Sequence, residues 1–224
     1  MKYDKTLLNE VHGSSNLLNK QIFKDKPMTA DHLASINHKF LGGGMSQNYF
    51  AIPWFEYYFD IHKFEYIIEI GSQKGCLSTY FANFAAITEQ CFFETYEINP
   101  NKDWYERKYE GCGHWYEKLA EISPFINFYH GDIFNEDFIN HIKENISQFK
   151  TFIFCDGGNK IKEFNTLAPL LKQGDCIAVH DWNMEINLAS ISDCVSQNGY
   201  VEDEPSASSA DSFRTQIKPF IKKE

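Results

Sequence analysis

The sequence lacks both a long apolar segment and a leader-like start. The apolar stretch Tyr66–Ile70 is far too short to cross a bilayer, which takes about 20 residues, and no apolar run approaches that length. The amino terminus, Met1–Lys5, leads into Asn and Ser residues rather than into an apolar stretch of the kind that signal peptides contain. We therefore expect no membrane partner and a cytoplasmic location.

Basic residues are also in deficit. The chain has 21 Lys and Arg residues against 31 Asp and Glu residues, which gives a formal net charge of −10 at pH 7. Binding to nucleic acid depends on a surplus of positive charge that neutralises phosphates, and the sequence shows no basic stripe. We expect a small-molecule substrate and no nucleic-acid partner.

The cysteines form neither a disulfide pattern nor a zinc pattern. Six of them are scattered along the chain, at positions 76, 91, 112, 155, 176 and 194. Three lie inside predicted strands, which suits small buried residues in a reducing compartment. Cys112-Gly113-His114 could begin a zinc site, but no second pair of ligands follows at zinc-site spacing.

What is present indicates one globular domain with an N-terminal addition. The chain has 224 residues, of which 43% are apolar and 16% aromatic, enough for a substantial core. Residues 61–224 alternate between strand-like and helix-like patterns, which predicts an α/β domain. Residues 1–60 lack this alternation, and we expect them to form an accessory segment.

Two interpretations of the accessory segment remain open. It contains the run Gly42-Gly43-Gly44 and an aromatic cluster made of Tyr49, Phe50, Trp54, Phe55, Tyr57, Tyr58 and Phe59. A helical segment that packs on the sheet is the favoured interpretation. The alternative is a mobile lid, with the glycines as its hinge and the aromatic side chains as a wall over the substrate, and both can hold together. The same aromatic residues are a candidate contact in a homo-oligomer.

The α/β domain is organised around a glycine turn. The strand-like run Tyr66–Ile70 ends at Gly71, Gly75 follows four positions later, and a helical pattern begins immediately after. The apolar side of that helix is formed by Leu77, Tyr80, Phe81, Phe84 and Thr88. A strand, a glycine turn and a helix form the ligand site of doubly wound sheets, because glycine lets the backbone approach a ligand closely.

The spacing of the glycines narrows the choice of ligand. A dinucleotide fingerprint has the form G-x-G-x-x-G, and here Gln73 and Cys76 occupy its second and third glycine positions. A phosphate-binding P-loop is excluded, since no Gly-Lys-Ser/Thr follows at the required distance. What remains is Glu69-Ile-Gly-Ser-x-x-Gly75; packing alone could also explain its glycines.

Glu97 lies near the end of the next predicted strand, Cys91–Ile98, and 26 residues beyond Gly71. In doubly wound folds an acidic residue about 20 residues past the first glycine accepts hydrogen bonds from ribose hydroxyls. A carboxylate suits that task because it only accepts and can take both hydroxyls at once. A solvated glutamate at a strand end is the alternative.

Each of three later predicted strands is followed by an acidic residue. Ile126–Tyr129 is followed by Gly131-Asp132-Ile133, Thr151–Cys155 by Asp156-Gly157-Gly158, and Cys176–Val179 by His180-Asp181. Helical patterns over about 134–146, 161–171 and 185–197 separate these strands, with Asn135 as a candidate cap and Pro169 expected to shorten the second helix. Residues 200–201 and 215–221 are expected to pair as a closing antiparallel unit.

Taken in order, these motifs resemble the class I methyltransferases that use S-adenosylmethionine (SAM), over roughly residues 60–224. The resemblance implies a mostly parallel, seven-stranded, Rossmann-like sheet of strand order 3-2-1-4-5-7-6, and SAM as cofactor. Carried over residue by residue, it implies a cofactor site made of Glu69, Gly71, Ser72, Gly75, Glu97, Asp132, Ile133 and Asp156.

The later motifs resemble one branch more closely. The order strand–Asp–Gly–Gly, helix, Leu-Leu-Lys-x-Gly-Asp, strand, His-Asp is similar to cephalosporin-hydroxylase-like, macrocin and catechol O-methyltransferases. That resemblance implies a divalent metal held by Asp156, His180 and Asp181. Oxygen ligands favour Mg²⁺, whereas His180, where the family often has an acidic residue, shifts the preference toward Mn²⁺. Alternatively, the two aspartates merely cap helices and hydrogen-bond loop amides.

Such a site has little chemical activation to provide, because the sulfonium of SAM is already an activated methyl donor. Catalysis then depends mainly on positioning the methyl group and the acceptor in line. The hydroxyl of the acceptor must lose its proton, and a metal or a base can assist. The candidate catalytic residues are Asp156, His180 and Lys160; the last stands four residues after Asp156 instead of the three found in catechol-type enzymes, and could be a solvated helix-start residue.

We therefore expect a SAM-dependent O-methyltransferase (EC 2.1.1.-) that acts on a small hydroxylated molecule, either a sugar or a secondary metabolite. Two alternatives remain open at this point. One is a binding or scaffold protein that has a methyltransferase fold without turnover. The other is a Rossmann-type NAD(P) oxidoreductase, disfavoured by the missing middle glycine.

Overall fold

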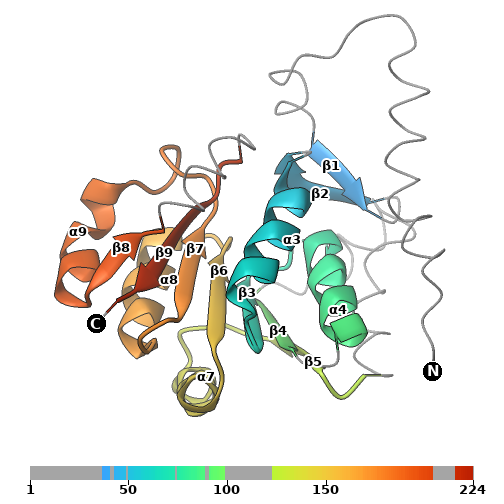
Figure 1. The fold of residues 1–224 in the computed structure, drawn as a ribbon, viewed down its shortest axis with the longest axis horizontal. Helices are drawn as coiled ribbons and strands as arrows, with labels where there is room; N and C mark the ends of the chain where they lie inside the picture. The colour runs from blue at the N-terminus through green and yellow to red at the C-terminus, as the bar shows by residue number, and fades with distance from the viewer. Residues whose placement is uncertain are drawn as a thin grey trace, which may run out of the picture.

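The computed structural model describes residues 37–40, 43–48, 50–73, 75–88, 91–98, 123–203 and 215–223. Two short strands, β1 (Asn37–Phe40) and β2 (Gly43–Asn48), form an antiparallel hairpin ahead of the first helix, α3 (Ala51–His62). The strands and helices then alternate to the carboxyl end (Figure 1). The hairpin is a feature that the sequence did not predict.

A single seven-stranded sheet forms the centre of the domain. Its strands are β3 (Tyr66–Ile70), β4 (Phe92–Glu97), β5 (Ile126–His130), β6 (Thr151–Cys155), β7 (Cys176–Val179), β8 (Tyr200–Glu202) and β9 (Lys218–Lys222). Their spatial order is β5-β4-β3-β6-β7-β9-β8. In sequence rank this is 3-2-1-4-5-7-6, so the predicted fold is confirmed.

The direction of each strand follows from its sequence. The first five strands are mutually parallel, and β3, β6 and β7 are buried along their whole length, as expected for strands covered on both faces. β9 lies between β7 and β8 and pairs antiparallel with both. This is the closing antiparallel unit that residues 200–201 and 215–221 predicted.

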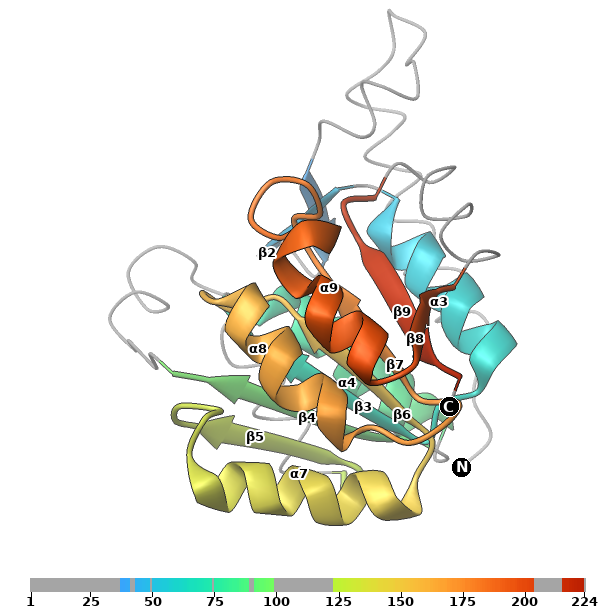
Figure 2. The ribbon, with the colours of Figure 1, turned by 90° about the vertical axis from the view of Figure 1, so that its left-hand side faces the viewer.

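Helices cover both faces of the sheet (Figures 1 and 2). One face carries α3 and α4 (Cys76–Thr88), and the other carries α7 (Glu136–Gln148), α8 (Lys160–Leu167) and α9 (Leu188–Gln197). Alternate residues of each strand enter the two cores: Phe152 and Phe154 face α3 and α4, whereas Ile153 and Cys155 face the other helices.

The helix ends follow the local sequence. Asn135 caps α7 by accepting a hydrogen bond from the Asp137 amide at 2.9 Å, as predicted. α8 ends at Leu167 and continues as one turn of 3₁₀ helix, Ala168–Leu170, because Pro169 cannot extend an α-helix.

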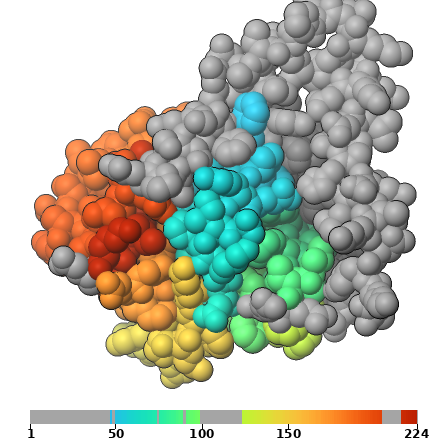
Figure 3. Space-filling view, in the orientation of Figure 1, coloured from blue at the N-terminus to red at the C-terminus, as the bar shows by residue number. Residues whose placement is uncertain are grey.

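Four members of the N-terminal aromatic cluster belong to the core, whereas Tyr57 is 41% exposed. Trp54, Phe55, Tyr58 and Phe59 on α3 are all buried, and the Phe55 ring meets those of Phe81 and Phe154 edge to face. In the space-filling view α3 lies between α4 and the carboxyl-terminal strands (Figure 3). This placement supports the packing interpretation for residues 51–62; residues 1–36, Gly42 and Tyr49 lie outside the described residues.

The cysteines within the described residues are free thiols, and all but Cys194 are buried; Cys112 and its neighbours lie in 101–122, outside that part of the chain. No helix among the described residues is long and apolar enough to span a membrane.

Candidate active site

A pocket of about 710 Å³ lies at the carboxyl ends of the parallel strands. This volume falls within the range of small-molecule sites in proteins. The lining comes from every loop that follows a parallel strand, and includes Gly71, Glu97, Asp132, Asp156 and His180. The topology therefore brings together residues that stand more than a hundred positions apart in the chain.

A row of backbone hydrogen bonds aligns the loops around this pocket. The residue just past four of the five parallel strands donates its N–H to the end of a neighbouring strand: Gly71 to Tyr96 O at 2.8 Å, Gly131 to Glu97 O at 2.9 Å, Asp156 to Ile70 O at 3.0 Å, and His180 to Cys155 O at 3.1 Å. The sheet pairing thus continues one step beyond the strands, and the loop residues enter the site in fixed register.

The glycine turn is packed against the loop after β6. Gly71 has φ +89°, and a Cβ there would lie 2.7 Å from Gly157 Cα and 2.8 Å from Asp156 O. Gly75 (φ +71°) closes the turn by donating its N–H to Ser72 O at 2.7 Å. Gly71 lines the pocket, whereas Ser72 and Gly75 are buried behind it. Gly71 is required here for both its conformation and its lack of a side chain.

Glu97 lies at the end of β4, on the pocket wall. Its Oε2 accepts the Gln73 N–H at 2.9 Å and lies 3.5 Å from Ser72 Oγ. The carboxylate therefore faces the glycine turn from the neighbouring strand, and its role in binding ribose stays a prediction. Asp132 and Ile133, after β5, line the same end of the pocket.

Glu69 occupies a different environment from the other predicted cofactor residues. It is fully buried beneath the turn, where its Oε2 accepts hydrogen bonds from the hydroxyls of Ser78 and, at 2.7 Å, Thr95. Burial raises the pKa of Glu69 to about 8, although both hydroxyl hydrogen bonds lower it. It does not line the pocket; it connects β3 to the start of α4 and to β4.

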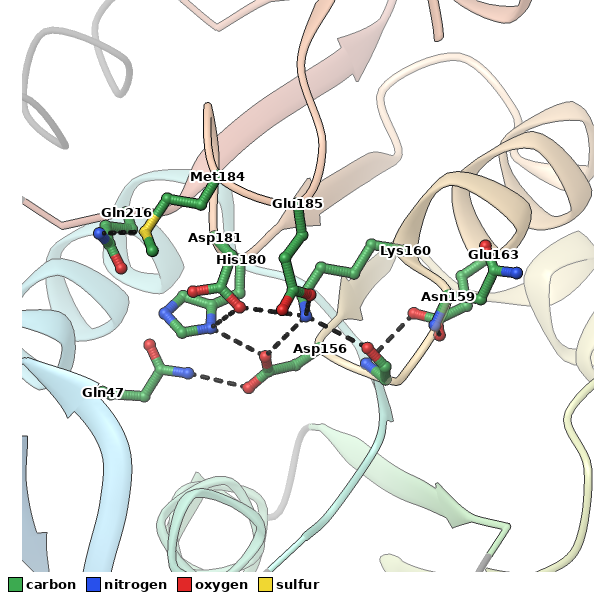
Figure 4. A network of polar contacts seen from close by, with 11 residues as sticks. Gln47, Asp156, Asn159, Lys160, Glu163, His180, Asp181, Met184, Glu185 and Gln216 are labelled. Carbon is green, nitrogen blue, oxygen red and sulfur yellow. Dashed lines mark hydrogen bonds and ion pairs between the residues drawn. The ribbon is translucent and has the colours of Figure 1, made fainter. Parts of the chain in front are cut away.

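The three predicted metal ligands converge at the other end of the pocket (Figure 4). His180 Nδ1 lies 2.8 Å from Asp156 Oδ1 and 3.4 Å from Asp181 Oδ2. Burial opposes protonation of His180, but the Asp156 carboxylate outweighs it, and the pKa of His180 is raised above its ordinary value. Asp181 has φ +56°, in the left-handed region that aspartate adopts more readily than most other residues.

Lys160 is part of this cluster and is not a solvated residue at a helix start. Only 6% of it is exposed, and its Nζ lies 2.7 Å from Glu185 Oε2, 3.1 Å from Asp181 Oδ2, 3.2 Å from Gly157 O and 3.9 Å from Asp156 Oδ1. Burial lowers the pKa of Lys160, but Glu185 and the two aspartates outweigh burial and raise it above the ordinary value. These surroundings favour a permanently charged ammonium and disfavour a base.

Three residues of the site were not found from the sequence. Glu185 ion-pairs with Lys160, and Gln47 on β2 donates its side-chain N–H to Asp156 Oδ2 at 2.8 Å. Glu163 accepts the N–H groups of Gly157 and Asn159 at 3.2 and 3.1 Å, which fixes the loop that carries Asp156. Burial raises the pKa of Glu163 to about 6. None of the three stands directly after a parallel strand, and that position is what identified residues such as Asp156 and His180 from the sequence.

The donor set fits one divalent cation. In an octahedral site with ligands at about 2.1 Å, adjacent ligand atoms are about 3.0 Å apart, which the separations of 2.8 and 3.4 Å approach. Asp156, Asp181 and Glu185 carry three formal negative charges against one on Lys160, so a dication would balance the cluster. Two carboxylate oxygens with one imidazole nitrogen suit Mn²⁺ at least as well as Mg²⁺.

No protein-family model matches the sequence, and neither does any curated protein. Solved structures do resemble it. The apo form of CmcI has 12% identity and a TM-score of 0.59, covering 94% of this chain and 95% of that one. The Mg–SAM form of CmcI has 14% identity and a TM-score of 0.52, covering 89% and 87%. A protein from Staphylococcus aureus, assigned as a caffeoyl-CoA O-methyltransferase, has 14% identity and a TM-score of 0.52, covering 97% and 98%. At these identities the likeness shows the fold, which is of the methyltransferase type.

Gly71→Ala should destabilise the protein by at least about 2 kcal/mol, since alanine is strained at this positive φ and its methyl group would overlap the Gly157 backbone. Gly158→Ala is the matched control, because a Cβ there meets nothing within 4 Å; it should change stability by less than about 0.5 kcal/mol. Urea unfolding of the two variants measures the difference. Equal stabilities would contradict the close contact between the two loops.

Glu69→Gln should alter how stability depends on pH. Because the pKa of Glu69 is raised to about 8 in the folded protein, its contribution is full below its ordinary pKa and is lost as the pH rises through about 8. Glutamine keeps the acceptor for Ser78 and Thr95 but cannot ionise. The stability of the wild type relative to Glu69→Gln should fall by about 2–4 kcal/mol between pH 5 and 8.5, as measured by urea unfolding. A difference that stays constant with pH would show that Glu69 is already ionised at pH 5 in the folded protein, so that its pKa is not raised.

Proposed function

We propose that this protein is a SAM-dependent methyltransferase that transfers a methyl group to a hydroxyl oxygen of a small molecule. The observation that carries the proposal is the single pocket that joins two chemically different halves. The glycine turn, Glu97 and Asp132 lie at one end, and the cluster of Asp156, His180 and Asp181 lies at the other. One end suits a nucleoside and the other suits a hydroxylated acceptor.

The nucleoside half is suited to SAM, the methyl donor. Glu97 can accept hydrogen bonds from both ribose hydroxyls, and Asp132 can accept one from the amino group of adenine, as in the methyltransferases that these motifs resemble. Ile98 and Ile133, which also line this end, supply apolar surface for the base. The SAM sulfonium is a cation, and the carboxylates that line the pocket favour its binding electrostatically.

The acceptor half is suited to lowering the pKa of a hydroxyl. When bound by Asp156, His180 and Asp181, a divalent cation would supply Lewis-acid assistance to the loss of that proton. Lys160, held by carboxylates and with a raised pKa, is assigned as a fixed cation that positions Asp156 and Asp181. Without a metal, His180 would be the candidate base, since Asp156 orients its ring through Nδ1.

The acceptor is proposed to be a sugar or a secondary metabolite. A formal net charge of −10 disfavours nucleic acid, and the pocket is of small-molecule size. Two of the similar structures support the donor and the reaction type: the Mg–SAM form of CmcI and the Staphylococcus aureus protein assigned as an O-methyltransferase.

Cofactor binding is tested by calorimetry with S-adenosylhomocysteine (SAH). The wild type should bind, and Glu97→Ala should weaken binding roughly 10- to 100-fold, since hydrogen bonds to a charged acceptor are lost. Glu65→Ala is the control, because Glu65 is exposed and stands at the opposite edge of the sheet, just before β3. Failure of the folded wild type to bind SAH would reject the proposed function.

The metal centre is tested by titration with Mn²⁺ monitored by electron paramagnetic resonance. Asp181→Asn should lower the affinity for Mn²⁺ at least 10-fold, because it removes a charged oxygen ligand, while the Kd for SAH stays within a few-fold. Asp137→Asn on the exposed first turn of α7 serves as the control. If the wild type binds SAH but not Mn²⁺, and methylates acceptors in the presence of a chelator, the metal is rejected and the methyltransferase assignment is retained.

A further inference from the structure

Gln47 enters the site from outside the α/β domain. It lies on β2 of the N-terminal hairpin, and only 1% of it is exposed. Its side-chain amide donates to Asp156 Oδ2 at 2.8 Å, across a separation of 109 residues in the chain. The hairpin packs on α4, the helix that follows the glycine turn, and this contact brings β2 close to the end of β6.

Because of this hydrogen bond, the two carboxylate oxygens of Asp156 have different partners. Oδ1 faces His180 and Lys160, while Oδ2 faces Gln47, which lies below His180 in Figure 4. The orientation of the Gln47 amide is determined by its partner, because a carboxylate only accepts and the other orientation would bring two oxygens together. The bond therefore fixes the orientation of the Asp156 carboxylate, with its second oxygen turned toward the cluster.

Once a cation is bound, the orientation of Asp156 would depend more strongly on its hydrogen bond to Gln47. His180 Nδ1 cannot donate a proton to Asp156 and also coordinate an ion, since ligation uses the lone pair of a nitrogen that carries no proton. Of the hydrogen bonds that hold the Asp156 side chain among the described residues, the one from His180 would then be lost and the one from Gln47 would remain. Hydrogen bonds of this kind to ligating carboxylates commonly contribute 10- to 100-fold to metal affinity.

We propose that Gln47 is a positioning residue of the acceptor half, which holds the Asp156 carboxylate so that Oδ1 can coordinate a divalent cation. This inference rests on the metal centre proposed above. The acceptor half would then be built by both the N-terminal hairpin and the sheet. Among the described residues, those that line the nucleoside half all come from loops of the sheet.

The test compares Gln47→Leu and Gln47→Asn with the wild type in the full-length protein. Leucine has a similar size but no donor, and asparagine keeps the amide but is about 1.5 Å too short to reach Asp156. Both variants should bind Mn²⁺ 10- to 100-fold more weakly, measured by electron paramagnetic resonance, while the Kd for SAH stays within twofold. Gln173→Leu is the matched control, because the Gln173 amide makes a bond of the same length, 2.8 Å, to Lys223 O on the surface.

The possible outcomes are distinct. Unchanged Mn²⁺ affinity in a folded Gln47 variant, with a wild type that binds Mn²⁺, would overturn the positioning role and leave the proposed function intact. Parallel loss of Mn²⁺ and SAH affinity would also overturn it, because that result indicates a general structural role. A wild type that binds SAH but no Mn²⁺ would reject the metal centre, and the inference with it. If Gln47→Leu does not fold, Gln47→Asn, which keeps a polar side chain of smaller size, provides the same comparison.

Discussion

The row of backbone hydrogen bonds across the carboxyl edge of the sheet is the interaction on which the site depends. Gly71, Gly131, Asp156 and His180 each donate to the end of a neighbouring strand, so four loops leave the sheet in a common register. Side chains one or two positions farther along then converge on one pocket. Because these donors and acceptors belong to the backbone, the alignment does not depend on which side chains follow.

Burial distinguishes the structural carboxylates from those proposed to act on ligands. Glu69, Glu94 and Asp175 are almost fully buried, and each is hydrogen-bonded by hydroxyl, imidazole, ammonium or backbone donors. A buried carboxylate is tolerated only with such partners. Asp156 and Glu97 are less buried, line the pocket, and are oriented by hydrogen bonds from protein donors. They keep contact with the cavity, where a ligand can bind.

The strand order and the residues at strand ends could be predicted from the sequence because they depend on local patterns. A buried β-branched run predicted β3, and residues at or just past the end of such a run are placed by the sheet itself, which is why Gly71, Glu97 and Asp156 were found. Gln47 could not be found this way, since its contact depends on how a hairpin packs on α4. The environment of Lys160 was also missed, because it depends on Glu185 and on the left-handed backbone of Asp181, which no periodicity records. Glu69 was placed in the right motif, but its burial beneath the turn follows from the tertiary packing of Ser78 and Thr95.

The two halves of the proposed site are therefore specified in different ways. The nucleoside half needs a glycine with φ +89° at position 71 and an acidic residue at the end of the next strand. Few substitutions satisfy those steric and hydrogen-bonding conditions. The acceptor half needs only that side chains of suitable charge converge above β6 and β7, and here a histidine, a lysine and a glutamine from a separate hairpin take part. Many combinations can meet that looser condition.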